Sequence, residues 1–259
     1  MYPYDIVAGL DLYGIMLCIA ILAALLIFRL GADRVKLKTG LLNFTIFTGC
    51  IAIVCGYFSA VLFQAFYNIQ KYGEFRLDTQ TGATFYGGLI GGALVFLLIY
   101  FGVGFFRFRK DKEHIRHFWQ ISDIASASIA AAHGFGRIGC LMAGCCHGAV
   151  TDRWYGIYMV SEKAKVIPVQ LYEAIFLFLL AAWFLYRVWK GKGYHLCLYM
   201  VLYGVWRFLI EYARDDYRGT TFVPFLTPSQ LTAVLMIVGG IALFAVRRIY
   251  RRRTEKTHE

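Results

Sequence analysis

The sequence predicts an all-α integral membrane protein with seven transmembrane helices, an outside N-terminus, an inside C-terminus and a small periplasmic lobe. Three observations carry this prediction. Of the 259 residues, 59% are hydrophobic and only 17% are charged, which is typical of a membrane chain. Apolar runs long enough to cross a bilayer, about 20 residues each, recur along the whole chain. Basic residues cluster between alternate runs.

The apolar runs define the expected spans. We expect helices at Leu12 to Phe28, Leu41 to Phe66, Thr84 to Phe106, Phe118 to Met142, Val169 to Val188, Leu196 to Ile210 and Pro228 to Val246. Together they predict a single transmembrane domain over residues 1–259, with an outer lobe at 149–167 and a cationic cytoplasmic tail at 247–259. The segment Met1 to Asp11 has no basic residue before the first run, so we expect no cleavable leader.

The charge pattern predicts the orientation of the chain in the membrane and argues against nucleic acid as a partner. The net charge is +11, and most of the 27 lysines and arginines fall in the segments that an N-out threading places on the cytoplasmic side. This follows the positive-inside rule. We therefore interpret the basic patches as orientation signals and anionic-lipid contacts, and we expect no nucleic-acid partner.

The stretch His133 to Gly148 places Arg137 among glycines and other small residues in an otherwise apolar chain. A guanidinium at membrane depth is costly unless an anion accompanies it. Arg137 is therefore a candidate contact for a lipid phosphate, and pairing with a structural carboxylate is the alternative. His133 lies four residues earlier, so the two side chains share a face if this part is helical.

The run from Phe85 contains Tyr86 followed by paired glycines, among them Gly87 and Gly88. Small residues let helices or lipid approach the backbone closely. Two interpretations stay open. The run is either a packing seam with an anchoring tyrosine or the wall of a site with a phenolic hydroxyl that donates to phosphate.

Three cysteines follow Arg137 within the same stretch, and they raise the question of a metal. Cys140, Cys145, Cys146 and His147 are all of ligand type, but they come from one short run. Structural zinc sites usually combine paired cysteines from two arms of the chain. We therefore expect no metal and no cofactor. The remaining cysteines lie in apolar runs and are interpreted as small packing residues.

Two further polar patterns mark the fifth and sixth spans. Gln170 and Glu173 open the fifth span, either as capping residues or as ligands. In the sixth span Tyr203, Arg207 and Glu211 are spaced by four residues, which places them on one helical stripe. A second arginine at membrane depth favours a cavity for a phosphodiester, and an internal Arg207–Glu211 pair is the alternative.

These motifs resemble the bacterial prolipoprotein diacylglyceryl transferase family. The resemblance rests on five ordered stretches, which begin at Tyr86, Gly136, Pro168, Tyr203 and Ser229. It implies a multi-pass enzyme of the bacterial cytoplasmic (inner) membrane. The implied reaction transfers the diacylglyceryl group of phosphatidylglycerol to the lipobox cysteine thiol of a preprolipoprotein signal peptide and releases glycerol phosphate. By the same resemblance Arg137 and Arg207 are catalytic, and the carried-over site positions are Tyr13, Gly148, Glu173, Tyr203 and Glu211.

The chain also departs from the family pattern. The family histidine before Gly-Gly-Leu is Tyr86 here, the asparagine three residues after the signature arginine is Cys140, and the acidic residue a few positions later is absent. The proton acceptor therefore stays open among Tyr86, His133 and His147.

The reaction requires a thiolate to displace a phosphate ester at carbon. We expect Arg137 and Arg207 to clamp the phosphate and stabilise the charge of the leaving group. The membrane lipid is then the donor, and Gly87, Gly88, Cys140 and Gln170 are expected to help line the substrate site. Two alternatives remain: a divergent member that uses the same lipid with another acceptor, and a non-catalytic lipid-binding protein.

Overall fold

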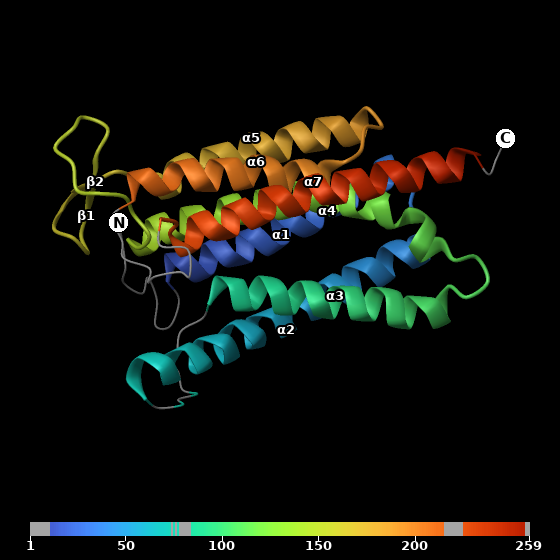
Figure 1. The fold of residues 1–259 in the computed structure, drawn as a ribbon, viewed down its shortest axis with the longest axis horizontal. Coiled ribbons are helices and arrows are strands. Elements are labelled where there is room, and N and C mark those ends of the chain that lie inside the picture. Colours follow the sequence, from blue (N-terminus) through green and yellow to red (C-terminus); the bar gives the residue numbers. More distant parts are fainter. Residues whose placement is uncertain (1–10, 74, 76, 78–83, 215–224, 257–259) are drawn as a thin grey trace. The chain divides into compact units, whose positions relative to one another are not determined.

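The structure is a computed structural model that describes residues 11–73, 75, 77, 84–214 and 225–256. The elements in chain order are α1 (Leu12–Arg34), α2 (Thr39–Tyr72), α3 (Phe85–Arg107), α4 (Glu113–Ala143), β1 (Ile157–Met159), β2 (Ala164–Val166), α5 (Val169–Trp189), α6 (His195–Ile210), a 3-10 turn (Glu211–Ala213) and α7 (Pro228–Lys256). Figure 1 shows these elements coloured along the chain.

The described chain is a helical membrane protein, as the composition predicted. Six helices are long and apolar enough to span a bilayer: α1, α2, α3, α5, α6 and α7. Many of their large apolar side chains are exposed, for example Leu98 at 71% and Phe106 at 78%, which is the expected surface for contact with lipid tails. One short antiparallel hairpin, β1 with β2, adds to the helices.

The remaining long helix, α4, contains no stretch as apolar as those of the other six. It contains a buried row of small and polar residues, including Ser122, Asp123, Ser126 and Ser128. A helix enclosed by other helices does not need an apolar surface toward lipid, and polar residues at membrane depth face the interior of a bundle. This explains why α4 is not among the six apolar candidates.

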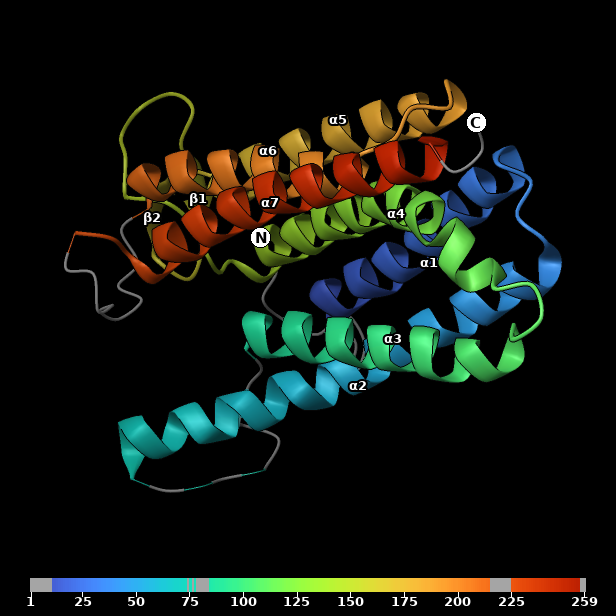
Figure 2. The same ribbon diagram turned by 45° about the vertical axis from the view of Figure 1, so that its right-hand side comes forward.

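The chain divides into two compact units, residues 36–118 and the remainder. The first consists mainly of α2 and α3, which lie side by side in both views (Figures 1 and 2). Their contact is a glycine seam: a Cβ on Gly91 would lie 2.1 Å from Ser59 Oγ, and one on Gly56 would lie 3.0 Å from the Gly88 carbonyl oxygen. Ser59 Oγ also donates a hydrogen bond of 2.9 Å to the Gly87 carbonyl. Backbone therefore meets backbone along this pair.

The second unit contains α1, most of α4, α5, α6 and α7, which run along one another in Figure 2. Its interior is built from small residues and a few rings. Ala127 of α4 packs with Leu180 and Phe184 of α5, and the Phe184 ring stacks on His195 with a centroid separation of 5.2 Å. Small residues let these helices approach closely without polar atoms at the contact.

A buried ion pair fixes α4 against α7 at the end of this unit opposite Arg137. Arg247 Nη1 and Nη2 donate to the two carboxylate oxygens of Asp123 at 2.7 and 2.5 Å. The guanidinium lies between the rings of Trp119 and Tyr194, 4.9 and 4.5 Å from their centroids. Asp123 also accepts from the backbone N–H of His195 at 2.7 Å. One carboxylate thereby joins α4, α6 and α7.

The segment at 149–167, predicted as a small lobe, forms the β hairpin and its flanking loops. The register pairs Ile157 with Val166 and Met159 with Ala164. Met159 and Val166 are fully buried and pack against Leu141 near the end of α4. The hairpin is thus attached to the end of α4 where the arginine stretch lies.

Candidate functional site

The site is centred on an ion pair between α4 and α5. Arg137 Nε lies 3.0 Å from Glu173 Oε2, and the Glu173 side chain is fully buried. Because α5 begins at Val169, Glu173 stands near its N-terminal end, where the helix dipole favours a negative charge. The pairing of Arg137 with a carboxylate, left open by the sequence, is therefore present.

Two aromatic hydroxyls and His133 extend this pair into a network. Tyr203 donates its hydroxyl to Glu173 Oε1 at 2.7 Å. His133 Nε2 lies 3.5 Å from the same hydroxyl and 4.0 Å from Glu173 Oε1, and His133 Nδ1 lies 3.1 Å from the Tyr199 hydroxyl. His133 and Arg137 thus share a face of α4, as predicted from their spacing.

Arg207 forms a second, adjacent pair. Its Nη2 lies 2.8 Å from Glu211 Oε2 and donates to Ser229 Oγ, also at 2.8 Å. Glu211 Oε1 accepts from Thr227 Oγ1 at 3.0 Å. The Arg207 side chain is only 5% exposed, and its buried Nη1 has no hydrogen-bond partner among the described residues. The internal Arg207–Glu211 pair is therefore present, with donor capacity left over.

The two arginines influence the same buried groups. The charges of both Arg137 and Arg207 act on Glu173 and on His133. Both guanidinium groups, one from α4 and one from α6, therefore lie within electrostatic range of Glu173 and His133 in the second unit. Each guanidinium has a carboxylate of its own, so the internal charges balance before any substrate arrives.

The sequence missed three contributors to this centre. Tyr199 precedes Tyr203 by four residues on α6, and that spacing is the signal that could have identified it. Ser229 and Thr227 stand at the start of α7, where they contact Arg207 and Glu211. Only the fold brings the start of α7 beside the end of α6.

Tyr13 lies beside the arginine stretch at the start of α1. Asp11 caps this helix by accepting from the Gly14 N–H at 2.7 Å. The Tyr13 ring covers Gly139, since a Cβ on that glycine would lie 3.0 Å from Tyr13 Cδ2. Tyr13 also acts electrostatically on Arg137 and on the neighbouring cysteines.

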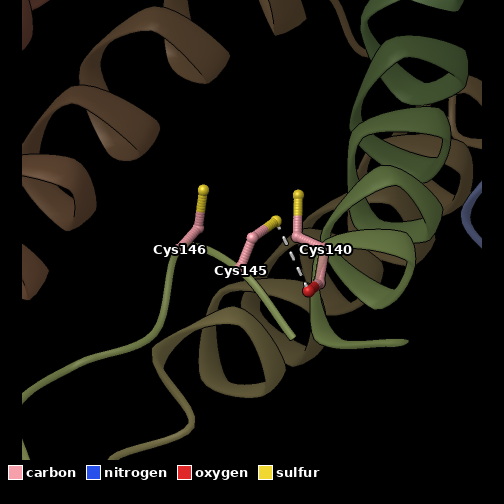
Figure 3. Close-up of side chains that lie close together, drawn as sticks. All are labelled: Cys140, Cys145 and Cys146. Carbon is pink, nitrogen blue, oxygen red and sulfur yellow. Dashed lines mark hydrogen bonds between the residues drawn. The ribbon is translucent and has the colours of Figure 1, made fainter. Parts of the chain in front are cut away.

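The three cysteines that follow Arg137 gather at the end of α4 (Figure 3). Their sulfur atoms all lie within 4.8 Å of one another. The helix ends at Ala143, Gly144 takes a φ of 72°, and the chain folds back so that the Cys145 N–H donates to the Cys140 carbonyl at 3.1 Å. The Cys145 thiol donates to that carbonyl as well, at 3.7 Å. All three cysteines are free.

The charge environment of this trio favours the thiolate at one position. The pKa of the Cys146 thiol is lowered, because the thiols of Cys140 and Cys145 donate toward its sulfur and the guanidinium groups of Arg214 and Arg137 lie near it. The trio therefore belongs to the same electropositive surroundings as the arginine centre.

Gln170 and Gly148 hold the turn that carries the cysteines. Gln170 Nε2 donates to the Cys145 carbonyl at 2.5 Å, and the side chain is fully buried. A Cβ on Gly148 would lie 2.5 Å from the Ala213 carbonyl oxygen and 2.9 Å from Val169 Cγ1. Gln170 therefore fixes the turn by a hydrogen bond, and Gly148 lets the chain pass close to Ala213 and Val169.

Of the other two candidate proton acceptors, the structure describes only the side chain of His147. His147 Nδ1 is 2.9 Å from the Gly148 carbonyl oxygen, and Nε2 is 3.1 Å from Glu162 Oε1. Both ring nitrogens are engaged, so the structure does not bring His147 into the His133–Glu173 network.

The Tyr86 side chain lies outside the described part of the structure. Gly87 packs against Phe63 of α2, with a hypothetical Cβ 2.6 Å from Phe63 Cβ, and Gly88 faces Ala60 in the same seam.

The sequence is also similar to a known protein family. The sequence model of the prolipoprotein diacylglyceryl transferase family matches residues 5–246. A relative from Clostridium perfringens named phosphatidylglycerol–prolipoprotein diacylglyceryl transferase 2 is 31% identical over 252 residues, 93% of this chain and 92% of its own. A Clostridium tetani transferase is 31% identical over 254 residues, 93% of this chain and 94% of its own. A Campylobacter hominis transferase is 28% identical over 263 residues, 94% of this chain and 88% of its own.

Proposed function

This chain belongs to the prolipoprotein diacylglyceryl transferase family, and we propose that its arginine centre binds the phosphate of phosphatidylglycerol during the transfer. The protein is a transferase that moves the diacylglyceryl group of phosphatidylglycerol onto a prolipoprotein. The acceptor atom that we assign is the thiol of the lipobox cysteine in the signal peptide, and the released product is glycerol phosphate. The membrane that we assign is the bacterial cytoplasmic (inner) membrane.

The topology that we propose has seven spans, with the N-terminus outside and the C-terminus inside. A helix of 31 residues is about 46 Å long at 1.5 Å per residue. The hydrocarbon layer is about 30 Å thick, so α4 is long enough to be the seventh span although it is polar. The basic ends of α1 and α7 then lie in the cytoplasm, which agrees with the positive-inside rule. The arginine centre and the β hairpin lie toward the outer side.

The observation that carries the proposal is the spare donor of Arg207. A buried donor without an acceptor costs about 1–3 kcal/mol, and Nη1 of Arg207 is such a donor. A guanidinium has five N–H groups, so Arg207 can keep its bonds to Glu211 and Ser229 and still bind a phosphate oxygen. We assign to Arg137, which pairs with Glu173, the stabilisation of the charge that develops on the leaving phosphate.

Among the candidate proton acceptors the geometry favours His133. It is in contact with Tyr199 and Tyr203 and lies close to Glu173. These groups orient the ring within the arginine centre, where a thiol proton has to be removed. We therefore assign to His133 the role of proton acceptor, with Glu173 and Tyr203 as positioning residues.

The experiment is a transfer assay with purified protein, phosphatidylglycerol labelled in its acyl chains and in its head group, and a peptide that carries a lipobox cysteine. We expect labelled peptide and an equal amount of glycerol phosphate. Replacing Arg207 by lysine removes the planar guanidinium group with its several fixed N–H donors, and it should lower the transfer rate more than tenfold. The matched control is Arg187→Lys, since Arg187 donates to the Gly193 carbonyl at the other end of α5. Full activity of Arg207→Lys would refute the phosphate contact.

The assay also separates the two alternatives. The cysteine at position 140, where the family pattern has asparagine, motivates the first of them, another acceptor. Release of glycerol phosphate without labelling of the peptide would indicate that acceptor. Bound phospholipid without any glycerol phosphate would indicate a lipid-binding protein instead of an enzyme.

A further inference from the structure

The cysteine trio is a preformed group, because its backbone is held from several sides. Ser161 Oγ donates to the Gly144 carbonyl at 2.8 Å, and Gln170 donates to the Cys145 carbonyl. Cys146 has a φ of 60°, a left-handed conformation that costs a residue other than glycine about 1–3 kcal/mol. Such conformations persist where the surrounding structure enforces them, and they cluster at functional sites.

The spacing of the three sulfurs suits one metal ion. Zinc binds cysteine sulfur at about 2.3 Å, which places tetrahedral thiolate ligands about 3.8 Å from one another. The sulfurs of Cys140, Cys145 and Cys146 already lie within 4.8 Å of one another, so a shift of about 1 Å closes the site. A disulfide between two of them would leave the third sulfur unpaired.

The sequence argued against a metal because all three thiols come from one run. The fold removes this objection. The turn after α4 brings the three thiols together, whereas other zinc sites need two separate segments of the chain to do so. Among the described residues, these three cysteines form the only cluster of three or more side chains of metal-ligand type. His147 does not join them, since both its nitrogens face other partners.

We propose that Cys140, Cys145 and Cys146 bind one zinc ion as thiolates, and that the fourth coordination position receives the acceptor thiol of the prolipoprotein. The number of ligands distinguishes this site from a structural one. Structural zinc is usually closed by four protein ligands, whereas catalytic zinc has three and an open position. Cys145 is exposed and the other two are half-buried, so the trio has a side that a substrate can reach.

The charges around the trio are compatible with three bound thiolates. Zinc with three thiolates has a net charge of −1, and the guanidinium groups of Arg137 and Arg214 act on the sulfurs. Thiolates are soft ligands, which select zinc over magnesium or calcium. Arg137 precedes Cys140 by three residues on α4, so a bound acceptor thiol would lie next to the phosphate contact.

This inference rests on the proposed function and gives the acceptor thiol a route to its reactive form. A thiol that coordinates zinc loses its proton, and the proton passes to His133 or to water. The sulfur electron pair then forms a bond to the glycerol carbon of the diacylglyceryl group. The bond from that carbon to the phosphate oxygen breaks, and its electrons leave with glycerol phosphate. Nothing is oxidised or reduced, and zinc is unchanged. The trio thus occupies the region where the family pattern has an asparagine, at position 140, and an acidic residue a few positions later.

The first test measures zinc on the full-length protein purified without chelators. We expect about one zinc per chain by elemental analysis, and at least tenfold weaker zinc binding in each of Cys140→Ser, Cys145→Ser and Cys146→Ser. Cys197→Ser is the matched control, because Cys197 is buried on α6 and belongs to no such group. Because serine nearly matches cysteine in size, circular dichroism should show unchanged helix content. Zinc should also protect the three wild-type thiols from alkylation, a readout that needs no variant.

The second test replaces zinc by cobalt, whose absorption reports its ligands. A thiolate charge-transfer band is expected in the wild type, and it should grow when a lipobox peptide is added. The same peptide with serine in place of cysteine should leave the spectrum unchanged. A wild-type protein without metal, or one whose thiols zinc does not protect, would overturn the site. If the cobalt spectrum of the wild type does not change when the cysteine peptide is added, the fourth coordination position does not receive the acceptor thiol.

The two proposals fail in different ways. If the protein transfers diacylglyceryl groups at full rate with a chelator present and contains no metal, the zinc site is wrong and the proposed function stands. If one zinc binds and cobalt senses the peptide thiol but no glycerol phosphate forms, the proposed function is wrong and the site stands.

Discussion

Arg137 and Glu173 form an ion pair of 3.0 Å between α4 and α5, and the same carboxylate accepts the Tyr203 hydroxyl at 2.7 Å. This one carboxylate therefore connects three helices at the centre of the site. The buried Arg137 guanidinium depends on this carboxylate, because removing the carboxylate would leave the guanidinium without its counter-charge.

Replacing Glu173 by glutamine should abolish transfer and destabilise the fold by about 3–5 kcal/mol, since Arg137 would lose its counter-charge in a buried position. The measurements are the transfer rate and the thermal midpoint in detergent. Glu162→Gln serves as the control, because Glu162 pairs with His147 at a more exposed position. An unchanged thermal midpoint would show that Arg137 has another counter-ion.

Replacing Tyr203 by phenylalanine should lower kcat by about tenfold with a smaller effect on KM. A hydrogen bond to a charged group is worth about 1.5–3 kcal/mol, and here it holds Glu173 beside Arg137 and His133. Tyr212→Phe is the matched control, because Tyr212 is 74% exposed. If Tyr203→Phe has wild-type kinetics, the hydroxyl does not position the carboxylate.

Replacing Gly148 by alanine should cost activity and stability together, since its Cβ would overlap the Ala213 carbonyl oxygen at 2.5 Å. The neighbouring backbone bonds would have to shift, among them the 2.9 Å bond from the Gly148 N–H to the Ile167 carbonyl. Gly49→Ala offers a comparison, because nothing lies within 4 Å of its added Cβ. Two equally stable and active variants would contradict the close contact at Gly148.

Replacing Asp123 by asparagine should lower the thermal midpoint without changing the rate per folded molecule. Arg247 would keep its stacking on Trp119 and Tyr194 but lose a bidentate counter-ion, at a cost of about 3–5 kcal/mol. Asp33→Asn tests an exposed pair of the i, i+4 type, where the expected change is within about 0.5 kcal/mol. A loss of rate in well-folded Asp123→Asn would mean that this pair also serves the reaction.

Local spacing predicted those parts of the site that lie on one helix. His133 with Arg137, and Arg207 with Glu211, follow from the helical repeat, and both pairs share a face as expected. The membrane class and the positions of the apolar helices followed from composition and run length for the same reason, because each depends only on neighbouring residues.

Contacts between helices could not be predicted in this way. Nothing in the sequence spacing joins Arg137 to Glu173 or Arg207 to Ser229, since these pairs depend on how α4 meets α5 and how α6 meets α7. The convergence of the cysteines depends on the turn at Gly144. The polar character of α4 also misleads a hydropathy argument, because its surroundings are protein instead of lipid.

The seam between α2 and α3 has a consequence for how the protein is made. Because Gly56, Gly91 and Ser59 bring the two backbones together without long side chains between them, neither helix needs a later part of the polypeptide to find its neighbour. This hairpin can therefore assemble as soon as α3 has left the ribosome and entered the bilayer. The helix α4, whose polar residues need contacts with other helices in the bilayer, would then be synthesised after α2 and α3 have paired.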